Sequence, residues 1–161
     1  MKTLYTITIF TENTPGVLYR IADLFLRRKI NIESLTVSEI NQEEQSRFTI
    51  VVFAEESLIE KMVKQLYRII EVTKVIDSID QDLVAREIAL LKVSANNLEK
   101  RKEIEHLVTI TSNTRIVKVT QNYLVIEITG TEHAVNDFHE LMKPFGIKEF
   151  VQSGRIAVFN T

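Results

Sequence analysis

The chain has 161 residues, of which 45% are apolar and 26% are charged, and this composition suits a globular fold with a substantial core. Its 20 Lys and Arg residues against 22 Asp and Glu residues leave a formal net charge of -2, which disfavours nucleic acid as a partner. Cysteine is absent, so the sequence excludes disulfides, thiolate nucleophiles and cysteine-based metal sites. Because no apolar run is long enough to cross a membrane, we expect a cytoplasmic chain without a secretion signal or a membrane span.

The opening segments predict a strand, a helix and a hairpin. Residues 4–10 alternate polar and apolar side chains, which is typical of a strand. The next stretch predicts a helix whose apolar face carries Val17, Leu18, Ile21, Leu24 and Phe25. Two β-rich runs, 31–40 and 47–53, flank the polar segment 41–45 and predict a hairpin.

A second helix and a fourth strand complete the first half of the chain. Ser57 can cap this helix, whose apolar side chains are Ile59, Met62, Val63, Leu66 and Ile70. Residues 71–76 then predict a strand. The first half therefore has the element order βαββαβ, which forms a four-stranded antiparallel sheet with two helices on one face, the ferredoxin-like arrangement.

The second half of the chain repeats this order. Strands are expected at 88–93, 115–120, 123–129, 147–151 and 155–159, and helices at 98–108 and 131–142. Polar residues interrupt the β pattern at 80–85, so we expect domains at 1–79 and 80–161. The sequence therefore predicts an α+β fold of two ferredoxin-like βαββαβ domains, each an antiparallel sheet with helices on one face.

Two strands are too apolar for a sheet with one face in solvent. Consecutive apolar residues at 50–53 and 124–126 place apolar side chains on both faces of their strands. A sheet that carries helices on only one face must cover the other face in another way. We expect homodimerisation or a partner subunit to cover it.

The turn from the first strand into the first helix, residues 11–18, is a candidate binding site for a small anion. Asn13 or Thr14 can cap the helix. Pro15 suits its first turn, and Gly16 has no Cβ to block an incoming group. Backbone N–H groups at the start of a helix, with the positive end of the helix dipole behind them, favour a carboxylate. The same residues also fit a well-capped helix start that binds no ligand.

Asn31, at the start of the second strand, is a second candidate binding residue. Its carboxamide has a donor and an acceptor, so it can meet the ammonium and the carboxylate of an amino acid. It also fits a turn in which the side chain satisfies backbone groups of the loop.

Two groups of residues around these segments carry a resemblance to a known family. The first group is Glu12, Asn13, Gly16, Leu18, Arg20, Ile21 and Phe25. The second is the run Asn-Ile-Glu-Ser-Leu-Thr-Val at 31–37, followed by Ser46 and Arg47. Together they resemble the ACT domain of the regulatory small subunit of acetohydroxyacid (acetolactate) synthase. Further matches at 64–66, 86–88, 130–131 and 153–154 extend the resemblance over nearly the whole chain, with one departure at Gln152, where the family often has a basic residue.

The resemblance implies a non-catalytic subunit that binds the catalytic subunit of acetolactate synthase and raises its activity. It also implies feedback inhibition by valine or another branched-chain amino acid. Thiamine diphosphate, magnesium and FAD are then expected on the catalytic partner, and no cofactor is expected on this chain. The alternative that stays open is an amino-acid-sensing ACT protein that regulates a different enzyme.

The resemblance also implies where the effector binds. ACT domains pair side by side into a homodimer, and the effector lies at the pairing interface. By motif match, Asn13 and Gly16 hold it from one subunit and Asn31 holds it from the other. Val17 and Leu18 offer first-turn amides and apolar contact, and Ile32 lies beside Asn31 at the pocket.

Other classes of protein fit the sequence less well. RNA-binding sheets of the same element order stack bases on exposed aromatic residues, but Phe48 and Phe53 fall on opposite faces of their strand. The three histidines have no converging partners, although His133 and Asp137 are one helical turn apart, a spacing that could hold a cation. We find neither a phosphate-binding glycine-rich loop nor a catalytic Ser/His/Asp set, so we expect no enzyme, no metal site, no nucleic acid and no membrane partner.

Overall fold

The computed structural model describes residues 1–40 and 44–160 of the chain. These residues form two compact units, and the first unit is built from two separate pieces of the chain. It contains Met1–Ala85 together with Arg155–Thr161, whereas the second unit contains Arg86–Gly154. Part of the expected hairpin turn, residues 41–43, lies outside the described residues.

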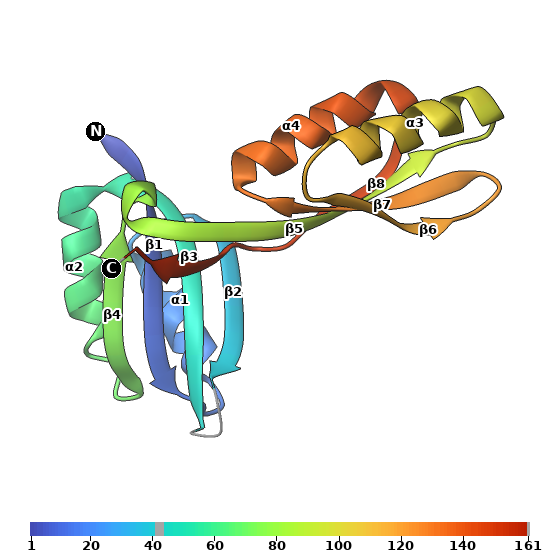
Figure 1. The fold of residues 1–161 in the computed structure, drawn as a ribbon. Helices are drawn as coiled ribbons and strands as arrows, with labels where there is room; N and C mark the ends of the chain where they lie inside the picture. The colour runs from blue at the N-terminus through green and yellow to red at the C-terminus, as the bar shows by residue number, and fades with distance from the viewer. Residues whose placement is uncertain (41–43, 161) are drawn as a thin grey trace. The chain divides into compact units, whose positions relative to one another are not determined.

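The first unit has the element order βαββαβ that the sequence predicts (Figure 1). Its elements are β1 (Lys2–Glu12), α1 (Val17–Arg27), β2 (Ile32–Ile40), β3 (Gln45–Glu55), α2 (Glu56–Leu66) and β4 (Val72–Ser78). The four strands form an antiparallel sheet in the order β2-β3-β1-β4. β2 and β4 are therefore the edges of this sheet.

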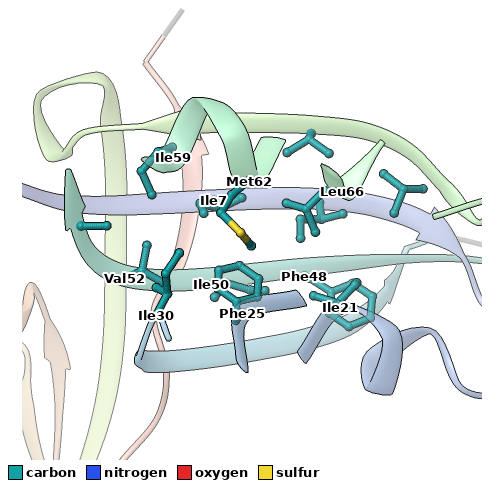
Figure 2. Close-up of a cluster of buried hydrophobic side chains, with 14 of the residues drawn as sticks. Ile7, Ile21, Phe25, Ile30, Phe48, Ile50, Val52, Ile59, Met62 and Leu66 are labelled. Atoms are coloured by element: carbon teal, nitrogen blue, oxygen red, sulfur yellow. The ribbon is translucent and has the colours of Figure 1, made fainter. Parts of the chain in front are cut away.

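The core of the first unit lies between the sheet and its two helices (Figure 2). α1 buries Val17, Ile21 and Phe25, which are spaced four residues apart and so share one face of the helix. The other buried side chains come from α2 and from alternate positions of β1 and β3, namely Ile59, Met62, Leu66, Ile7, Ile9, Phe48, Ile50, Val52 and Ala54. Each fully buried Ile or Phe contributes about 1.5–3 kcal/mol to folding.

Part of the opposite face of this sheet is covered by a later segment of the same chain. Thr6, Thr8 and Thr49 lie on this face, at strand positions that alternate with the core residues, and each is at most 3% exposed. β9 (Ile156–Phe159) pairs with β5 (Leu83–Ser94) and lies against this face, where Figure 1 shows it in dark red. Phe53, on the same face, is still 53% exposed, so β9 covers only part of the face and the expectation that a second subunit covers it stays a prediction.

Arg155 holds the covering segment to the sheet. This residue is 4% exposed, and its Nη1 donates to Asp80 Oδ1 at 2.6 Å and to Thr6 Oγ1 at 3.2 Å. A hydrogen bond between two charged groups is stronger than one between neutral groups. The contact therefore ties the C-terminal segment both to β1 and to the turn before β5.

A second arginine, Arg47 of β3, contacts the same segment. Its guanidinium donates to the carbonyl oxygen of Ala157 and lies 5.5 Å from the ring centre of Phe10 and 5.9 Å from that of Phe159. Burial lowers the pKa of Arg47, but a guanidinium stays protonated at neutral pH. The cation between two aromatic rings therefore joins β1, β3 and β9.

The second unit repeats the same order of elements. After β5 come α3 (Leu98–Ile110), β6 (Thr114–Val119), β7 (Tyr123–Gly130), α4 (Glu132–Met142) and β8 (Ile147–Gln152), with short 3-10 turns at Asp80–Asp82 and Lys143–Phe145. The strands form an antiparallel sheet in the order β6-β7-β5-β8. The core is formed chiefly by Leu91, Val93, Ile104, Leu124, Ile126, Ile128, Val135, Phe138 and Met142. On the face of this sheet opposite the core, Ile88, Leu90 and Val151 are exposed.

The partition of the chain differs from the expected domains 1–79 and 80–161. The first unit extends to Ala85 and also takes residues 155–161. The reason is that the polar turn Asp80–Asp82 is part of its structure, because Asp80 bonds Arg155 and the carbonyl oxygen of Asp82 accepts from the Asn160 N–H at 2.9 Å. The polar residues at 80–85 therefore belong to the first unit.

Two predictions about α2 are wrong. The helix begins at Glu56 with Glu55 as its N-cap residue, so Ser57 lies inside the helix and does not cap it. It ends at Leu66, so Ile70 is not on its apolar face and is 94% exposed.

Candidate functional site

The turn after β1 starts α1 with a glycine and not with a side-chain cap. Gly16 is the N-cap residue, and its φ of 90° lies in the left-handed region that favours glycine. α1 has no side-chain cap hydrogen bond, so the prediction that Asn13 or Thr14 caps it is wrong, and Pro15 precedes the helix. A Cβ at Gly16 would meet Arg20 Nη1 at 3.7 Å, an ordinary contact, so backbone conformation and not space requires glycine here.

The N-terminal amides of α1 are largely unsatisfied. The Val17 N–H donates to a carbonyl of the turn over a long 3.5 Å. Helical bonding begins at Arg20, whose N–H donates to the Gly16 carbonyl at 3.1 Å, so Leu18 and Tyr19 find no backbone acceptor among the described residues. Two free N–H groups and the positive end of the helix dipole make this turn suitable for a carboxylate.

The backbone around Asn13 is fixed, whereas its side chain is exposed. Its N–H donates to the carbonyl oxygen of Glu44 at 2.6 Å, and the Thr14 N–H donates to that of Glu12 at 3.1 Å. The turn is thus held to the start of β3. The exposed carboxamide of Asn13 can therefore contact a ligand.

An ion pair that the sequence did not single out as part of the site lies beside the turn. Arg20 Nη2 donates to Glu71 Oε1, and the carbonyl oxygen of Glu71 accepts from the Glu12 N–H at 2.9 Å. Arg20 follows Gly16 by one helical turn, and long side chains in a helix point back toward its N-terminus. The four-residue spacing between Gly16 and Arg20 in the sequence therefore predicts a cation next to the free amides.

Val17 and Leu18 contribute differently to this turn. Val17 is 3% exposed and packs into the core, so its side chain is not accessible to a ligand at the surface. Leu18 is 46% exposed. Of the two, only Leu18 offers both a free N–H group and an accessible apolar side chain.

Asn31 and Ile32 lie where α1 leads into β2. Asn31 is exposed, and its Nδ2 donates to Glu33 Oε1 at 2.9 Å, which leaves its carbonyl oxygen to accept from a ligand. Ile32 is half-buried and packs against the core of the first unit. The ammonium group of an amino acid is a suitable donor to the Asn31 oxygen.

The two candidate segments lie at opposite ends of the sheet of the first unit. Glu12 pairs with Gln45 at the start of β3, whereas Ile32 pairs with Val52 seven positions further along. At about 3.4 Å per residue, these positions are about 24 Å apart. A single amino acid therefore cannot contact both segments of the same chain.

The remaining candidates do not form a site. His133 Nδ1 lies 3.1 Å from Asp137 Oδ1, but both side chains are exposed, and no group of three or more His, Asp or Glu residues that could hold a metal occurs in the described part of the chain. Phe48 is 3% exposed and cannot stack on a base. No helix in the described ranges is long and apolar enough to cross a membrane.

Gln152, the position that departs from the family pattern, has a partner in the second unit. Its Nε2 donates to Glu87 Oε2, and Glu87 is 7% exposed. The neutral amide of Gln152 can donate to the Glu87 carboxylate without bringing a second charged group to this place. The hydrogen bond thus gives Gln152 a structural role between β8 and β5.

Comparison with known families assigns both units. Residues 7–74 match the model of the ACT domain of acetohydroxyacid synthase (AHAS) small-subunit-like proteins. Residues 86–160 match the model of the small subunit of acetolactate synthase. The first unit, with its βαββαβ fold and its glycine turn after β1, is therefore an ACT domain.

Whole-chain relatives identify the family. The chain is 44% identical over 154 residues to the probable acetolactate synthase small subunit of Archaeoglobus fulgidus, covering 96% of this chain and 95% of that one. It is 38% identical over 154 residues to the acetolactate synthase small subunit of Mycobacterium bovis, covering 96% and 90%. The crystal structure of the acetolactate synthase small subunit from Thermotoga maritima superposes with a TM-score of 0.88 at 34% identity and covers 98% of both chains. The chain belongs to the acetolactate synthase small-subunit family, and this membership supports the role of a regulatory subunit.

Proposed function

We propose that this chain binds the catalytic subunit of acetolactate synthase, raises its activity, and makes that activity sensitive to a branched-chain amino acid. The observation that carries the proposal is the turn at Gly16, where the Leu18 and Tyr19 N–H groups and the exposed Leu18 side chain meet beside Arg20. These groups suit the carboxylate and the apolar side chain of valine, leucine or isoleucine. Thiamine diphosphate, magnesium and FAD would then be held by the catalytic subunit.

The proposed effector site needs two copies of the chain, because Asn31 lies far from the turn of its own protomer. β2 is an edge of the sheet, and its Leu35 and Val37 side chains are 37% and 42% exposed. An edge strand offers unpaired backbone groups to a second strand. We therefore infer a homodimer in which the β2 strands of two protomers pair antiparallel about a two-fold axis.

The register of the sheet supports this arrangement. Ile40, at the end of β2, pairs with Gln45, and Gln45 pairs with Glu12, so the end of β2 is level with the turn that follows β1. In an antiparallel pair of β2 strands, the start of one β2 is level with the end of the other. Asn31 of one protomer is then at the same end of the joined sheet as the turn of its partner.

A ligand held between two protomers favours the dimer geometry that brings both halves of its site together. Its differential affinity can therefore shift the conformational state to which the catalytic subunit responds. A coupling free energy of about 1–3 kcal/mol corresponds to roughly 5- to 150-fold control. Choice among the branched-chain amino acids rests on pocket shape, because one methylene changes binding by only about 1–3 kcal/mol.

Reconstitution tests this function. The chain is mixed with the acetolactate synthase catalytic subunit of its own organism, and the rate of acetolactate formation is measured with and without valine, leucine, isoleucine and glycine. We expect the chain to raise the rate, and one of the branched-chain amino acids, but not glycine, to lower it. Stabilisation by valine without any activation of acetolactate synthase would favour an amino-acid sensor for another enzyme.

Variants at the two carboxamides test the site within the same assay. We expect Asn13→Ala or Asn31→Ala alone to raise the effector concentration needed for half-maximal inhibition about tenfold. This change is consistent with the loss of one hydrogen bond to a charged group. Activation by the variant subunit should stay close to that of the unaltered chain. Asn136→Ala, at an exposed position of α4, is the matched control. Loss of activation together with inhibition would mean that Asn13 and Asn31 are structural.

A further inference from the structure

A cleft of about 700 Å³ lies on the helical side of the first unit, between α1 and the segment that follows α2. We define the docking cleft by six of its lining residues, namely Tyr19, Leu24, Arg28, Arg68, Ile69 and Ile70. The turn at Gly16 is not part of it. Tyr19 is shared, because its N–H belongs to the proposed effector site and its residue lines the cleft, whereas the other five residues lie outside that site.

The charges around the cleft leave an excess of two cations. Arg27 Nε bonds Asp23 Oδ2 at 2.7 Å, and Arg20, as described above, is paired with a carboxylate. Within residues 1–40 and 44–160, the one side-chain partner of Arg28 Nε is neutral, Gln65 Oε1 at 3.2 Å. The guanidinium of Arg68 contacts no acceptor among the described residues. Arg28 and Arg68 therefore remain uncompensated on a chain whose formal net charge is -2.

Apolar side chains are exposed at the same place. Ile70 is 94% exposed and Tyr19 is 75% exposed, while Leu24 and Ile69 are half-buried and pack against the core. Single exposed apolar residues are common on protein surfaces. Here they line one concave surface together with two uncompensated guanidinium groups. Aromatic and aliphatic anchors near arginines are typical of the central contacts of protein interfaces.

We propose that the docking cleft binds an acidic segment of a protein partner that also carries apolar side chains. Carboxylates of the segment bind the guanidinium groups of Arg28 and Arg68, for which the planar fork geometry is well suited. Apolar side chains of the segment cover Ile70 and Tyr19. The inference rests on the proposed function, because it takes the catalytic subunit of acetolactate synthase as that partner.

A protein segment fits this surface better than a free small anion. A small anion would need only the two cations and would leave Ile70 and Tyr19 in water. An extended or helical segment covers both kinds of surface at once, and opposite charges speed its encounter with the cleft. The ion pair of Arg20 with Glu71 borders both the docking cleft and the turn at Gly16. The docking cleft and the proposed effector site therefore both include residues of α1.

The test compares the affinity of two full-length variants for the catalytic subunit. The double variant Arg28→Glu/Arg68→Glu reverses the two free charges, and Lys102→Glu/Lys118→Glu makes the same change in net charge at exposed positions of the second unit. The dissociation constant is measured by sedimentation velocity at low and moderate salt, with circular dichroism as the check on folding. We expect the cleft variant to bind about tenfold more weakly or worse at low salt, and the control to bind like the unaltered chain.

Each other result has a defined meaning. Equal affinities of the two double variants would overturn the docking proposal while leaving the proposed function intact. Failure of the unaltered chain to bind the catalytic subunit would instead refute the proposed function. Normal binding with a lost response to amino acids would mean that the cleft holds a small ligand, which also overturns the proposal. If Arg28→Glu/Arg68→Glu fails to fold, the milder variants Arg28→Gln and Arg68→Gln are measured singly. Their dissociation constants for the catalytic subunit are then compared with that of the unaltered chain, and weaker binding supports the proposal while equal binding overturns it.

A photo-cross-linking residue in place of Ile70, which lines the cleft and lies outside the proposed effector site, identifies the occupant directly. We expect the cross-linked peptide to come from the catalytic subunit and to contain several Asp or Glu residues. A cross-link to a second copy of this chain would overturn the proposal. A cross-link to a basic or uncharged peptide of the catalytic subunit would do so as well.

Discussion

Gly16 determines how the chain passes from β1 into α1. Its left-handed backbone lets the helix start without a side-chain cap, and the amides of Leu18 and Tyr19 have no backbone acceptor in the part of the chain that the structure describes. Asn13 and Thr14 are good capping residues by type, which is why the sequence predicted them as caps. The path of the turn, held to β3 through the carbonyl oxygen of Glu44, decides otherwise.

Substitution of this glycine tests that account. We expect Gly16→Ala to lower the free energy of unfolding by about 1–2 kcal/mol, because an L side chain is strained in the left-handed region. Gly16→Asn should lose less, since asparagine tolerates this conformation better than alanine does. Both values come from chemical denaturation of the full chain. An alanine variant as stable as the unaltered chain would contradict the account.

At the scale of elements, most strands and helices could be predicted because their signals are local. The alternation in β1 and the four-residue spacing of Val17, Ile21 and Phe25 are visible within a few residues of sequence. The position of β9 could not be predicted in this way. Its contacts to the sheet join Arg155 to Thr6, which are 149 positions apart, and no pattern within β9 says which surface it covers.

The same limit applies to the candidate site. The turn at 13–18 was predicted from capping residues and from the resemblance, and the structure places free amides there. That Asn31 lies at the far end of the same sheet follows only from the register of β2 on β3. The pair Arg20 and Glu71 joins residues 51 positions apart, so only the fold brings its carboxylate to the turn.

A matched pair of substitutions in β9 tests its role as the cover of the sheet. Ala157 is 5% exposed and Val158 is 57% exposed. We expect Ala157→Asp to lower the free energy of unfolding by about 3 kcal/mol, because it buries an unpaired carboxylate. Val158→Asp, one position away, should change it by about 0.5 kcal/mol or less. Similar values for the two variants in urea denaturation would show that β9 does not cover the sheet in solution.

At the scale of the whole molecule, the second unit is an insertion into the first. The chain leaves the first unit after Ala85 and returns to it at Arg155. The two connections run side by side, because the Asp82 carbonyl accepts from the Asn160 N–H in the first unit. In the second unit, the Ile88 carbonyl accepts from the Ser153 N–H at 2.9 Å. A short linker could therefore replace residues 86–154.

Excision of the second unit tests this organisation. We expect a chain of residues 1–85, a short glycine-rich linker and residues 155–161 to unfold in one cooperative transition, because it retains both pieces of the first unit. Residues 1–79 alone should melt at a clearly lower temperature, since they lack Arg155 and Ala157 over the threonine face. Circular dichroism during heating measures both. Equal melting temperatures would favour the boundary at residue 79.

The return of residues 155–161 to the first unit also has a consequence for how the protein is made. The ribosome must produce residues 86–154 before Arg155 can reach Thr6, so the first unit begins to form long before its last segment is made. A polypeptide that stops short of this segment would expose the buried threonines of β1 and β3 to water. Only chains translated through β9 would then present a finished ACT domain to other subunits during assembly.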